Sequence, residues 1–376
     1  MFNLLCELIV GLHYNNKKGT EMLETLKSSR AARVASAALL TLTALACAAP
    51  ALAQQAEKPE AIYMYRGADR DARLLERARK EGTVVWYTSM SPAESRPLAE
   101  AFEKKTNVKV SLWRAAGDKV IQRIISEAQG NRYTFDVIES NTNEAERLAR
   151  ENLVSEFYSP YIADMPSAAI PASRKYFPDR FNFFVVSYNT NKVKAAELPK
   201  TYEGFLDPKW KGRIALEATD YDWLASVSQQ MGKDKGPAFF QKLAAMKPDQ
   251  RKGHPLLAEL VSAGEVPVGL TTYLSNAESG KRRGGPIDWA PIQPVIGVSF
   301  SVALAKTAPH PNAALLFADF ILSPEGQALL NSMGRFPAST KIKNSILNFP
   351  YTIVDVSGAI DDGDRREKHW NELFNK

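Results

Sequence analysis

The stretch Thr83-Val-Val-Trp-Tyr-Thr-Ser-Met-Ser-Pro-Ala-Glu94 decides the fold class of this chain. Its β-branched and aromatic run predicts a strand that stops at small hydroxyl residues. Ser91 then occupies the position of a helix N-cap, Pro92 the first helical position, and Glu94 the position that completes a capping box. In an open parallel sheet, such polar tips between strand and helix line a ligand crevice, where the free N–H groups of the helix start bind anions.

The same alternation of short apolar runs and helical patterns continues along the sequence, and it is typical of a mostly parallel sheet flanked by helices. The fold class is therefore α/β. The expected strands are Val84–Thr88, Val108–Arg114, Phe135–Glu139, Phe181–Tyr188, Arg213–Glu217, Val266–Thr271, Ile287–Ile292 and Gly297–Ala305. The expected helices are Asp69–Glu81, Pro92–Lys105, Asp118–Gln129, Asn143–Glu151, Trp223–Met231, Pro237–Ala245, Pro255–Ser262, Tyr273–Arg282 and Asn312–Leu322, and Ser323-Pro324-Glu325 starts another helix that runs to Ser332.

Two of the expected strands are long, and parts of them are apolar on both faces. These runs, Phe181–Tyr188 and Gly297–Ala305, are expected to pass between two lobes as hinge strands; the alternative is two central strands of a single sheet. The first lobe is then expected to contain residues 54–183 and about 298–345. The second is expected to contain residues about 184–297 and 346–376.

The N-terminal region predicts export. Residues 22–53 have the basic start, the apolar run and the small-residue cleavage site (Ala51-Leu52-Ala53) of a secretory signal peptide. We interpret residues 1–21 as an extension that the signal does not need, with Met22 as the initiator. The apolar run is too short for a membrane span, and a lipid anchor on Cys47 is the alternative. The expected location is the periplasm.

Composition limits the chemistry of the mature chain. Both cysteines, Cys6 and Cys47, precede the cleavage site, so we expect no disulfide, thiol nucleophile or thiolate metal site. The net charge of +6 for the whole sequence becomes +4 after cleavage, since five basic and three acidic residues are removed. About 320 residues remain, enough for two lobes with a large core.

Four polar tips that follow strands are the candidate binding groups. Each also fits a capping signal, as Ser91 does with Glu94, and a cap alone is worth about 1 kcal/mol. The four tips together are stronger evidence for a ligand site than any one of them, because each expected lobe contributes two tips that can enclose a small polar molecule. The candidate ligand-binding residues are Ser89, Met90, Ser91, Ser140, Asn141, Asp220, Tyr221, Asp222 and Tyr273.

Motifs for other functions are missing from the sequence. The mature chain has three histidines, His254, His310 and His369, without metal-ligand spacing, and it has no glycine-rich phosphate loop. The acidic run Asp361–Asp364 is interpreted as a solvated turn. The basic cluster Lys281–Arg283 lacks interleaved aromatic residues, so no nucleic-acid partner is expected. No catalytic residue and no cofactor are expected; a hydrolase or lyase that uses Asp220 and Asp222 as paired carboxylates is the alternative from another class.

Several stretches, in order along nearly the whole mature chain, resemble extracellular solute-binding proteins of ABC importers, and more narrowly the ferric-iron-binding-protein group. They include Leu206-Asp-Pro-Lys-Trp-Lys-Gly-Arg-Ile214. The others are Ala78–Ser89, Leu98–Val110, Phe135–Ser140, Val186–Lys192 and Asn312–Gly326. The resemblance implies the two-lobed type II periplasmic binding fold, a monomer, a small-molecule solute, and an ABC permease in the inner membrane as partner.

The resemblance leaves two kinds of solute open. Ferric members of the group bind Fe(III) with two adjacent tyrosines, helped by a histidine, a glutamate and an anion, whereas Gly269-Leu-Thr-Thr-Tyr-Leu-Ser275 has one tyrosine. Hydroxyl groups, helix N-termini and one phenol favour an anionic or oxygen-rich solute, with aromatic cover from Trp86, Tyr221 or Trp223. The alternative is Fe(III) held by Tyr273 with an exogenous anion and Glu139 or Asp222; otherwise no metal is expected.

Overall fold

The computed structural model describes residues 57–375, so the predicted signal peptide and the preceding extension lie outside the described residues. After α4 (Pro59–Tyr63) and α5 (Arg70–Glu81), the chain forms β1 (Thr83–Thr88) and α6 (Pro92–Thr106), which confirms the strand, tip and helix predicted there. The capping box is present, because the Glu94 carboxylate accepts hydrogen bonds from the backbone and the hydroxyl of Ser91.

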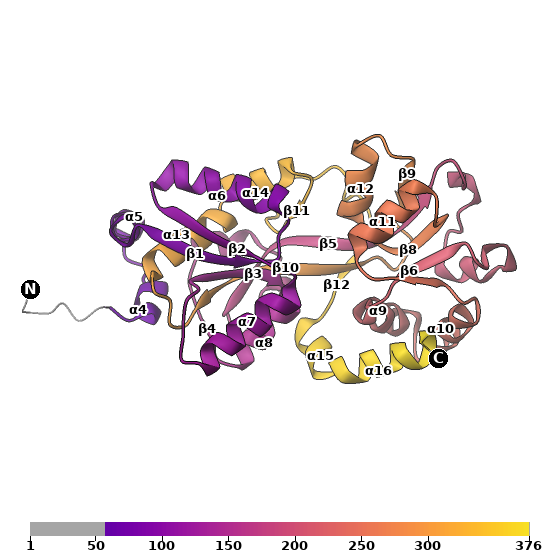
Figure 1. Cartoon of the computed structure of the whole chain (residues 1–376), viewed down its shortest axis with the longest axis horizontal. Coiled ribbons are helices and arrows are strands. Elements are labelled where there is room, and N and C mark those ends of the chain that lie inside the picture. Colours follow the sequence, from indigo (N-terminus) through magenta and orange to yellow (C-terminus); the bar gives the residue numbers. More distant parts are fainter. Residues whose placement is uncertain (1–56, 376) are drawn as a thin grey trace, which may run out of the picture. The chain divides into compact units, whose positions relative to one another are not determined.

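The first lobe is built on a sheet with the order β2-β1-β3-β10-β5. Its strands β2 (Lys109–Arg114), β1 and β3 (Val137–Asn141) are parallel to one another. Helices cover both faces, with α6, α13 and α14 on one side and α7 and α8 on the other (Figure 1). These helices are α7 (Gly117–Gln129), α8 (Thr142–Arg150), α13 (Pro311–Leu322) and α14 (Pro324–Ser332).

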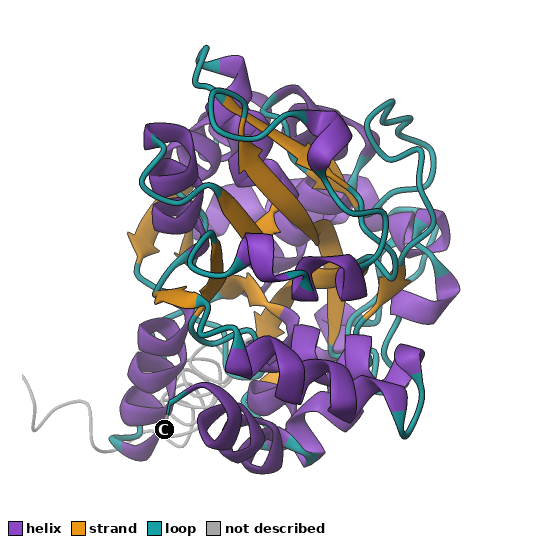
Figure 2. Ribbon diagram, turned by 90° about the vertical axis from the view of Figure 1, so that its right-hand side faces the viewer, coloured by secondary structure: helices purple, strands orange, loops and turns teal. Residues whose placement is uncertain are grey.

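The second lobe repeats the layered arrangement around the strand order β5-β8-β6-β7. Its strands are β6 (Ile214–Glu217), β7 (Asp249–Arg251), β8 (Val268–Tyr273) and β9 (Ile287–Ala290), of which β6 runs parallel to β7 and β8. Its helices are α9 (Tyr221–Met231), α10 (Lys235–Ala245), α11 (His254–Ala263) and α12 (Leu274–Arg282). Figure 2 shows the helices packed around the strands.

Two long strands, β5 (Tyr176–Asn189) and β10 (Ile296–Ala305), connect the lobes. The first part of β5 pairs with β10, whereas its last part pairs with β8 and β9 of the second lobe. Both strands run antiparallel to their neighbours in the path, so the sheet is mixed, and the expected parallel pairing is found among the outer strands. The two runs expected to pass between lobes thus occupy that position.

The C-terminal segment returns to both lobes. After β12 (Thr352–Ile353), which pairs with the start of β10, it forms α15 (Val356–Asp361) and α16 (Gly363–Phe374). Helix α15 packs on α8 of the first lobe, and α16 packs on α9 and α10 of the second. The short elements are β4 (Val154–Ser155), β11 (Phe336–Pro337) and the 3-10 turns at Pro160–Asp164, Ser167–Ala169, Ala195–Glu197, Tyr202–Leu206 and Pro208–Trp210.

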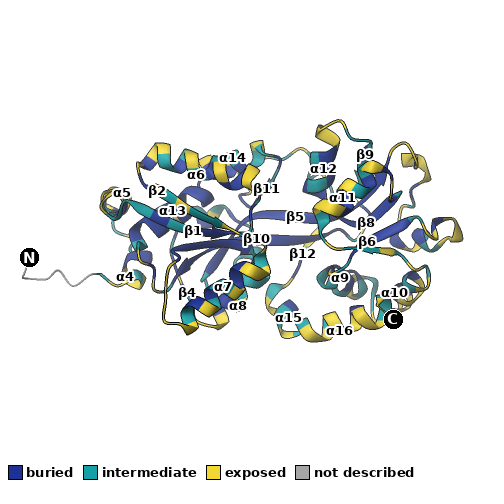
Figure 3. Ribbon diagram, in the orientation of Figure 1, coloured by how far each residue is buried: buried dark blue, intermediate teal, exposed yellow. Residues whose placement is uncertain are grey.

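The buried side chains form separate apolar cores, as expected for two lobes (Figure 3). One core surrounds Trp86 and Phe317 in the first lobe, and another surrounds Trp223 and Phe240 in the second. Both tryptophans are fully buried, so they serve packing. The C-terminal Trp370 belongs to the second core, whereas Ile346, Leu347 and Phe349 of the same segment pack against the first.

Among residues 57–375, no single helix has the length and apolar character needed to cross a bilayer. Helices α13 and α14 meet that test together, with a bend of 57° between them. In the structure, α13 is buried in the core of the first lobe.

Candidate functional site

A cavity of about 590 Å³ lies where the two lobes and the C-terminal segment meet. The start of α8 forms its first-lobe wall, the polar tips after β6, β7 and β8 form its second-lobe wall, and β5 and β10 contribute Phe184 and Val298. The lining residues that carry the argument below are Asn141, Asn143, Glu144, Arg147, Asp220, Tyr221, Asp222, His254, Tyr273 and Arg366.

A larger groove, of about 910 Å³, lies between α9, the start of α10 and α16. It is lined by the second lobe and the C-terminal helix, and by no residue of the first lobe. A molecule bound there does not bridge the lobes, so the smaller cavity is the candidate site.

Glu217 at the end of β6 organises the second-lobe wall. One carboxylate oxygen accepts hydrogen bonds from the backbone N–H and the hydroxyl of Thr219, at 2.6 and 2.7 Å, and the other accepts the N–H of Gly253 at 2.9 Å. The turn before α9 is thereby tied to the turn before α11. As a result Asp220 and His254, which are distant in sequence, meet at the cavity.

The orientation of His254 follows from its two hydrogen-bonding partners. Nδ1 lies 3.0 Å from the carbonyl oxygen of Thr271, and a carbonyl accepts only, so Nδ1 carries the proton. Nε2 lies 3.2 Å from Oδ1 of Asp220. The imidazole is therefore fixed with Nε2 toward the carboxylate.

The Asp220–His254 pair is buried and electrostatically coupled. Burial raises the pKa of Asp220 to about 6, against the lowering effect of His254. Burial lowers the pKa of His254, but Asp220, the Glu217 charge and the hydrogen bond to Thr271 together outweigh it, and the net pKa is raised. Oδ2 of Asp220, a residue only 5 % exposed, has no hydrogen-bond partner among the described residues.

Tyr273 places a phenol beside this pair. Its ring stacks on His254 with 3.4 Å between the ring centroids and 19° between the planes, and Phe184 packs against both rings. Within residues 57–375 its hydroxyl forms no hydrogen bond. Burial, followed by the Asp220 and Glu217 carboxylates, raises the pKa of Tyr273 well above its ordinary value, so the phenol stays protonated unless a cation binds.

The first-lobe wall is the capped start of α8. The Asn141 side chain accepts the backbone N–H of Asn143 at 3.0 Å, and the Ser140 hydroxyl donates to Glu144. Burial raises the pKa of Glu144 to about 7, although the Ser140 hydroxyl opposes this shift. Arg147 is exposed and has no ion-pair partner among the described residues, so its guanidinium is available to a ligand.

Asp222 joins the three walls of the cavity. Its Oδ2 accepts a hydrogen bond from Asn143 Nδ2 of the first lobe at 2.9 Å, and its Oδ1 pairs with Arg366 of α16 at 2.8 Å. Arg150 of α8 pairs with Asp361 at 2.5 Å. The interpretation of Asp361–Asp364 as a solvated turn is confirmed, because this run joins α15 to α16 through a turn at Asp362, and Asp361 and Asp364 are exposed.

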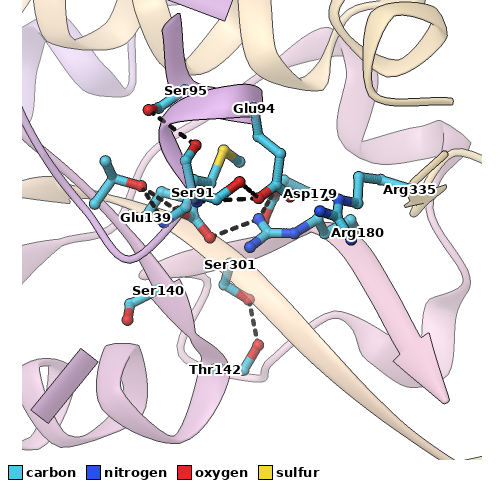
Figure 4. A network of polar contacts seen from close by, with 12 residues as sticks. Ser91, Glu94, Ser95, Glu139, Ser140, Thr142, Asp179, Arg180, Ser301 and Arg335 are labelled. Carbon is cyan, nitrogen blue, oxygen red and sulfur yellow. Dashed lines mark hydrogen bonds and ion pairs between the residues drawn. The ribbon is translucent and has the colours of Figure 1, made fainter. Parts of the chain in front are cut away.

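The tip after β1 faces a different environment, a buried network inside the first lobe (Figure 4). Arg180 Nη1 lies 2.6 Å from Glu139 and 2.7 Å from Asp179, and the other Glu139 oxygen accepts the hydroxyl proton of Thr88 at 2.5 Å. Glu94 pairs with Arg335 at 2.6 Å. Figure 4 shows that Ser91 and Glu94 approach Arg180, so the charged groups around this tip are paired within the lobe.

The nine candidate ligand-binding residues thus divide into two groups. Those that line the cavity are Asn141, Asp220, Tyr221, Asp222 and Tyr273. Those that belong to the β1 tip or the cap of α8, and do not line it, are Ser89, Met90, Ser91 and Ser140. Glu139, offered as an iron ligand in the alternative, is fully buried against Arg180 and does not line the cavity.

Sequence reasoning missed His254 and the C-terminal residues at the cavity. The signal for His254 was the run Gly253-His254-Pro255, a polar tip with proline in the first turn of a helix. This tip was missed because β7, the strand before it, is only three residues long and gives no strand pattern in the sequence. The signal for Arg366 was the apolar spacing of Trp370, Leu373 and Phe374, which indicates a helix packed on the second core.

Comparison with known proteins identifies a family and similar proteins. Residues 97–347 match the family model for bacterial extracellular solute-binding proteins. A protein named iron uptake protein A1, from Synechocystis sp. (strain ATCC 27184 / PCC 6803 / Kazusa), is 27 % identical over 290 residues, covering 70 % of this chain and 78 % of that protein.

Two solved structures share the fold at low sequence identity. Iron-bound HitA from Pseudomonas aeruginosa has a TM-score of 0.66 and 20 % identity, covering 77 % of this chain and 99 % of that chain. The periplasmic binding protein AfuA from Actinobacillus pleuropneumoniae, with fructose-6-phosphate bound, also has a TM-score of 0.66, with 24 % identity and coverage of 78 % and 99 %.

Proposed function

The chain belongs to the bacterial extracellular solute-binding proteins and has the type II periplasmic binding fold; we propose that it captures its solute in the cavity between the lobes. As the substrate-binding component of an ABC transporter, it delivers a small solute to a permease. We place it in the periplasm, with the permease in the inner membrane.

The observation that carries this proposal is that both lobes line one cavity. A solute there contacts α8 of the first lobe and the tips of the second at once. It therefore binds the closed arrangement better than an open one, and this difference in affinity drives closure. The strands β5 and β10, which connect the lobes, are the segments that bend.

The size and polarity of the cavity indicate the class of solute. A volume of about 590 Å³ suits a small organic molecule and exceeds the needs of a bare ion. Asn141, Arg147 and Tyr273 offer donors, while Glu144 and Asp364 offer acceptors. We infer an oxygen-rich solute that combines acceptor oxygens with hydroxyl groups, because a simple oxyanion does not use the carboxylates.

We further infer binding without chemical change. Asp220 and Asp222, the paired carboxylates of the hydrolase alternative, have separate partners: His254 for the first, and Asn143 with Arg366 for the second. The two carboxylates therefore do not act on each other as the pair that catalysis by two carboxylates needs.

Protein isolated from the periplasm of its native host tests the proposal. Native mass spectrometry of the full mature chain should detect a bound small molecule that unfolding in urea and refolding removes. Small-angle scattering should show a larger radius of gyration after this removal. A bound molecule whose loss leaves the scattering unchanged contradicts capture between the lobes.

Fe(III) is the second candidate solute, because the Tyr273 hydroxyl forms no hydrogen bond to the described part of the chain, and Tyr273 lines a cavity with Asp220 and Asp222. The names of relatives such as the iron uptake protein point the same way. Ferric citrate added to the stripped protein should then produce a visible phenolate-to-iron absorption band that Tyr273→Phe abolishes. A colourless mixture contradicts this candidate and leaves the organic solute.

A further inference from the structure

We propose that Glu217, Asp220 and His254 form a binding site for a divalent transition-metal ion of the Zn²⁺ class at the second-lobe wall of the cavity. One nitrogen and two carboxylates supply the donors. A metal there offers its remaining positions to the oxygens of the solute. This last step rests on the proposed function, whereas metal binding itself does not.

The spacing of the donor atoms fits one ion. One ligand atom from each of the three residues lies within 4.8 Å of the other two, and Nε2 of His254 is 3.2 Å from Oδ1 of Asp220. Two donors bound to Zn²⁺ at about 2.0–2.2 Å in tetrahedral geometry are separated by about 3.3–3.6 Å. The His254–Asp220 edge therefore needs only a small adjustment to accept the ion.

The imidazole is held as a metal ligand needs it. His254 Nδ1–H donates to the Thr271 carbonyl, so a neutral His254 directs the lone pair of Nε2 toward Asp220. A ligating histidine usually donates its other N–H to a carbonyl or carboxylate in this way. Glu217 is held in place by the Thr219 and Gly253 N–H groups, which fixes the third donor.

An independent observation points to a missing partner. Asp220 is 95 % buried and lines the cavity, yet its Oδ2 has no hydrogen-bond partner within residues 57–375. The Thr271 hydroxyl lowers the pKa of Asp220, but its oxygen accepts the N–H of Glu217, and Oδ2 has no hydrogen-bond partner among the described residues. The ion pair with His254 provides a partner for Oδ1 of Asp220 but none for Oδ2. A metal ion would supply the partner that this buried carboxylate oxygen needs.

The donor set distinguishes this site from the ferric candidate. An imidazole with two carboxylates suits borderline divalent ions, and Fe(III) held by the Tyr273 phenolate is a different arrangement. Tyr273 stacks on His254 and is not a donor here. Loss of the Tyr273 hydroxyl should therefore abolish ferric binding and leave divalent-metal binding in place.

Isothermal titration of the metal-stripped full mature chain with ZnCl₂, followed by Co²⁺ absorption spectroscopy, tests the proposal. We expect one ion per chain and visible Co²⁺ d–d bands. His254→Gln and Asp220→Asn should each weaken Zn²⁺ binding by about 10-fold to 100-fold or more. The control His369→Gln, an exposed histidine of α16, should bind as the wild type does.

Absence of one-to-one Zn²⁺ binding, or binding that survives both His254→Gln and Asp220→Asn, overturns the proposal. Equal loss in His369→Gln also overturns it, because it shows non-specific binding. Circular dichroism and urea midpoints establish that the variants are folded. If native mass spectrometry finds the solute retained in EDTA without metal, the metal site fails as the means of solute binding while the proposed function stands.

Discussion

The tip after β1 and the tip after β6 have the same sequence signature, a strand followed by polar residues and a capped helix, but their polar groups have different partners. In the first lobe, Glu94 and Glu139 are paired with Arg335 and Arg180 inside the core (Figure 4). In the second lobe, Asp220 keeps an unsatisfied oxygen beside an open cavity. Oδ1 of Asp179 in the first-lobe network also has no hydrogen-bond partner among the described residues, but Asp179 is fully buried and does not line the cavity. The difference therefore shows that a capping pattern identifies a helix start, and that a buried polar group indicates a binding site only where it reaches a cavity.

Arg180→Met should cause the largest loss of stability, because it removes the guanidinium that pairs with both Glu139 and Asp179 in the β1-tip network. Arg180 is 6 % exposed, so its loss leaves Glu139 and Asp179 buried without their partner. The free energy of unfolding, measured in urea, should fall by about 3–5 kcal/mol. Arg366→Met, at a partly exposed pair by the cavity, is the matched control and should cost much less. Similar losses in the two variants contradict the contrast between the tips.

Two buried aspartates that pair with histidines sharpen the comparison. Asp136 accepts the N–H groups of Val85 and His310 and the His310 ring, so Asp136→Asn places a donor against donors and should cost about 1–3 kcal/mol in urea unfolding. Asp220→Asn should change stability by less than about 1 kcal/mol, since its carboxylate is already poorly satisfied.

For solute binding the order of the two aspartate variants should be reversed, with the larger effect in Asp220→Asn. Native mass spectrometry of each protein from the periplasm should find the co-purifying molecule retained by Asp136→Asn and lost from Asp220→Asn. Retention in Asp220→Asn shows that the second-lobe tip does not hold the solute.

Ser91→Ala tests whether the β1 tip only caps its helix. The change removes the hydroxyl that contacts Glu94 at the N-cap of α6 and should reduce the free energy of unfolding by about 1 kcal/mol. Solute retention should not change, because Ser91 does not line the cavity. A variant that is as stable as the wild type but loses the solute shows that the tip faces the ligand.

The smallest expected effect is the pH dependence of stability from His310. Its hydrogen bond to Asp136 raises the pKa of His310 above the ordinary 6.5, burial opposes the shift, and the Asp136 and Glu81 charges add to it. The folded protein therefore holds this proton more tightly, so the contribution to stability is full below pH 6.5 and is lost as pH rises through the folded pKa. Urea midpoints of the wild type minus those of His310→Gln should decrease over this range; a constant difference contradicts the assignment.

Local patterns in the sequence were sufficient for most of the fold. The strand at Thr83–Thr88 and the helix at Pro92–Thr106 depend on β-branched runs and capping residues that act over a few positions. By contrast, β5 begins at Tyr176, five residues before the predicted start, because Pro178, Asp179 and Arg180 are unlike a strand in isolation. The charged side chains of Asp179 and Arg180 can be buried in this strand because Arg180 forms an ion pair with Glu139, which is distant in sequence.

The candidate site could be predicted in part for the same reason. The tips at Asp220 and Tyr273 follow strands and reach the cavity, as the order of strands and helices predicts. The sequence could not show that Arg180 lies beside the β1 tip, or that His254 packs on Tyr273, since each contact joins residues that are distant along the chain. Local patterns thus located the strand ends, while long-range pairing decided which of them stay open to a solute.

Amide hydrogen exchange on the protein as isolated, compared with the same protein after the bound solute is removed, measures the contrast between the two tips directly. We expect faster exchange after removal at residues 218–222 and 253–256, and no change at residues 89–94. Faster exchange at residues 89–94 with no change in the second-lobe tips contradicts the assignment of the solute to the cavity at Asp220, His254 and Tyr273.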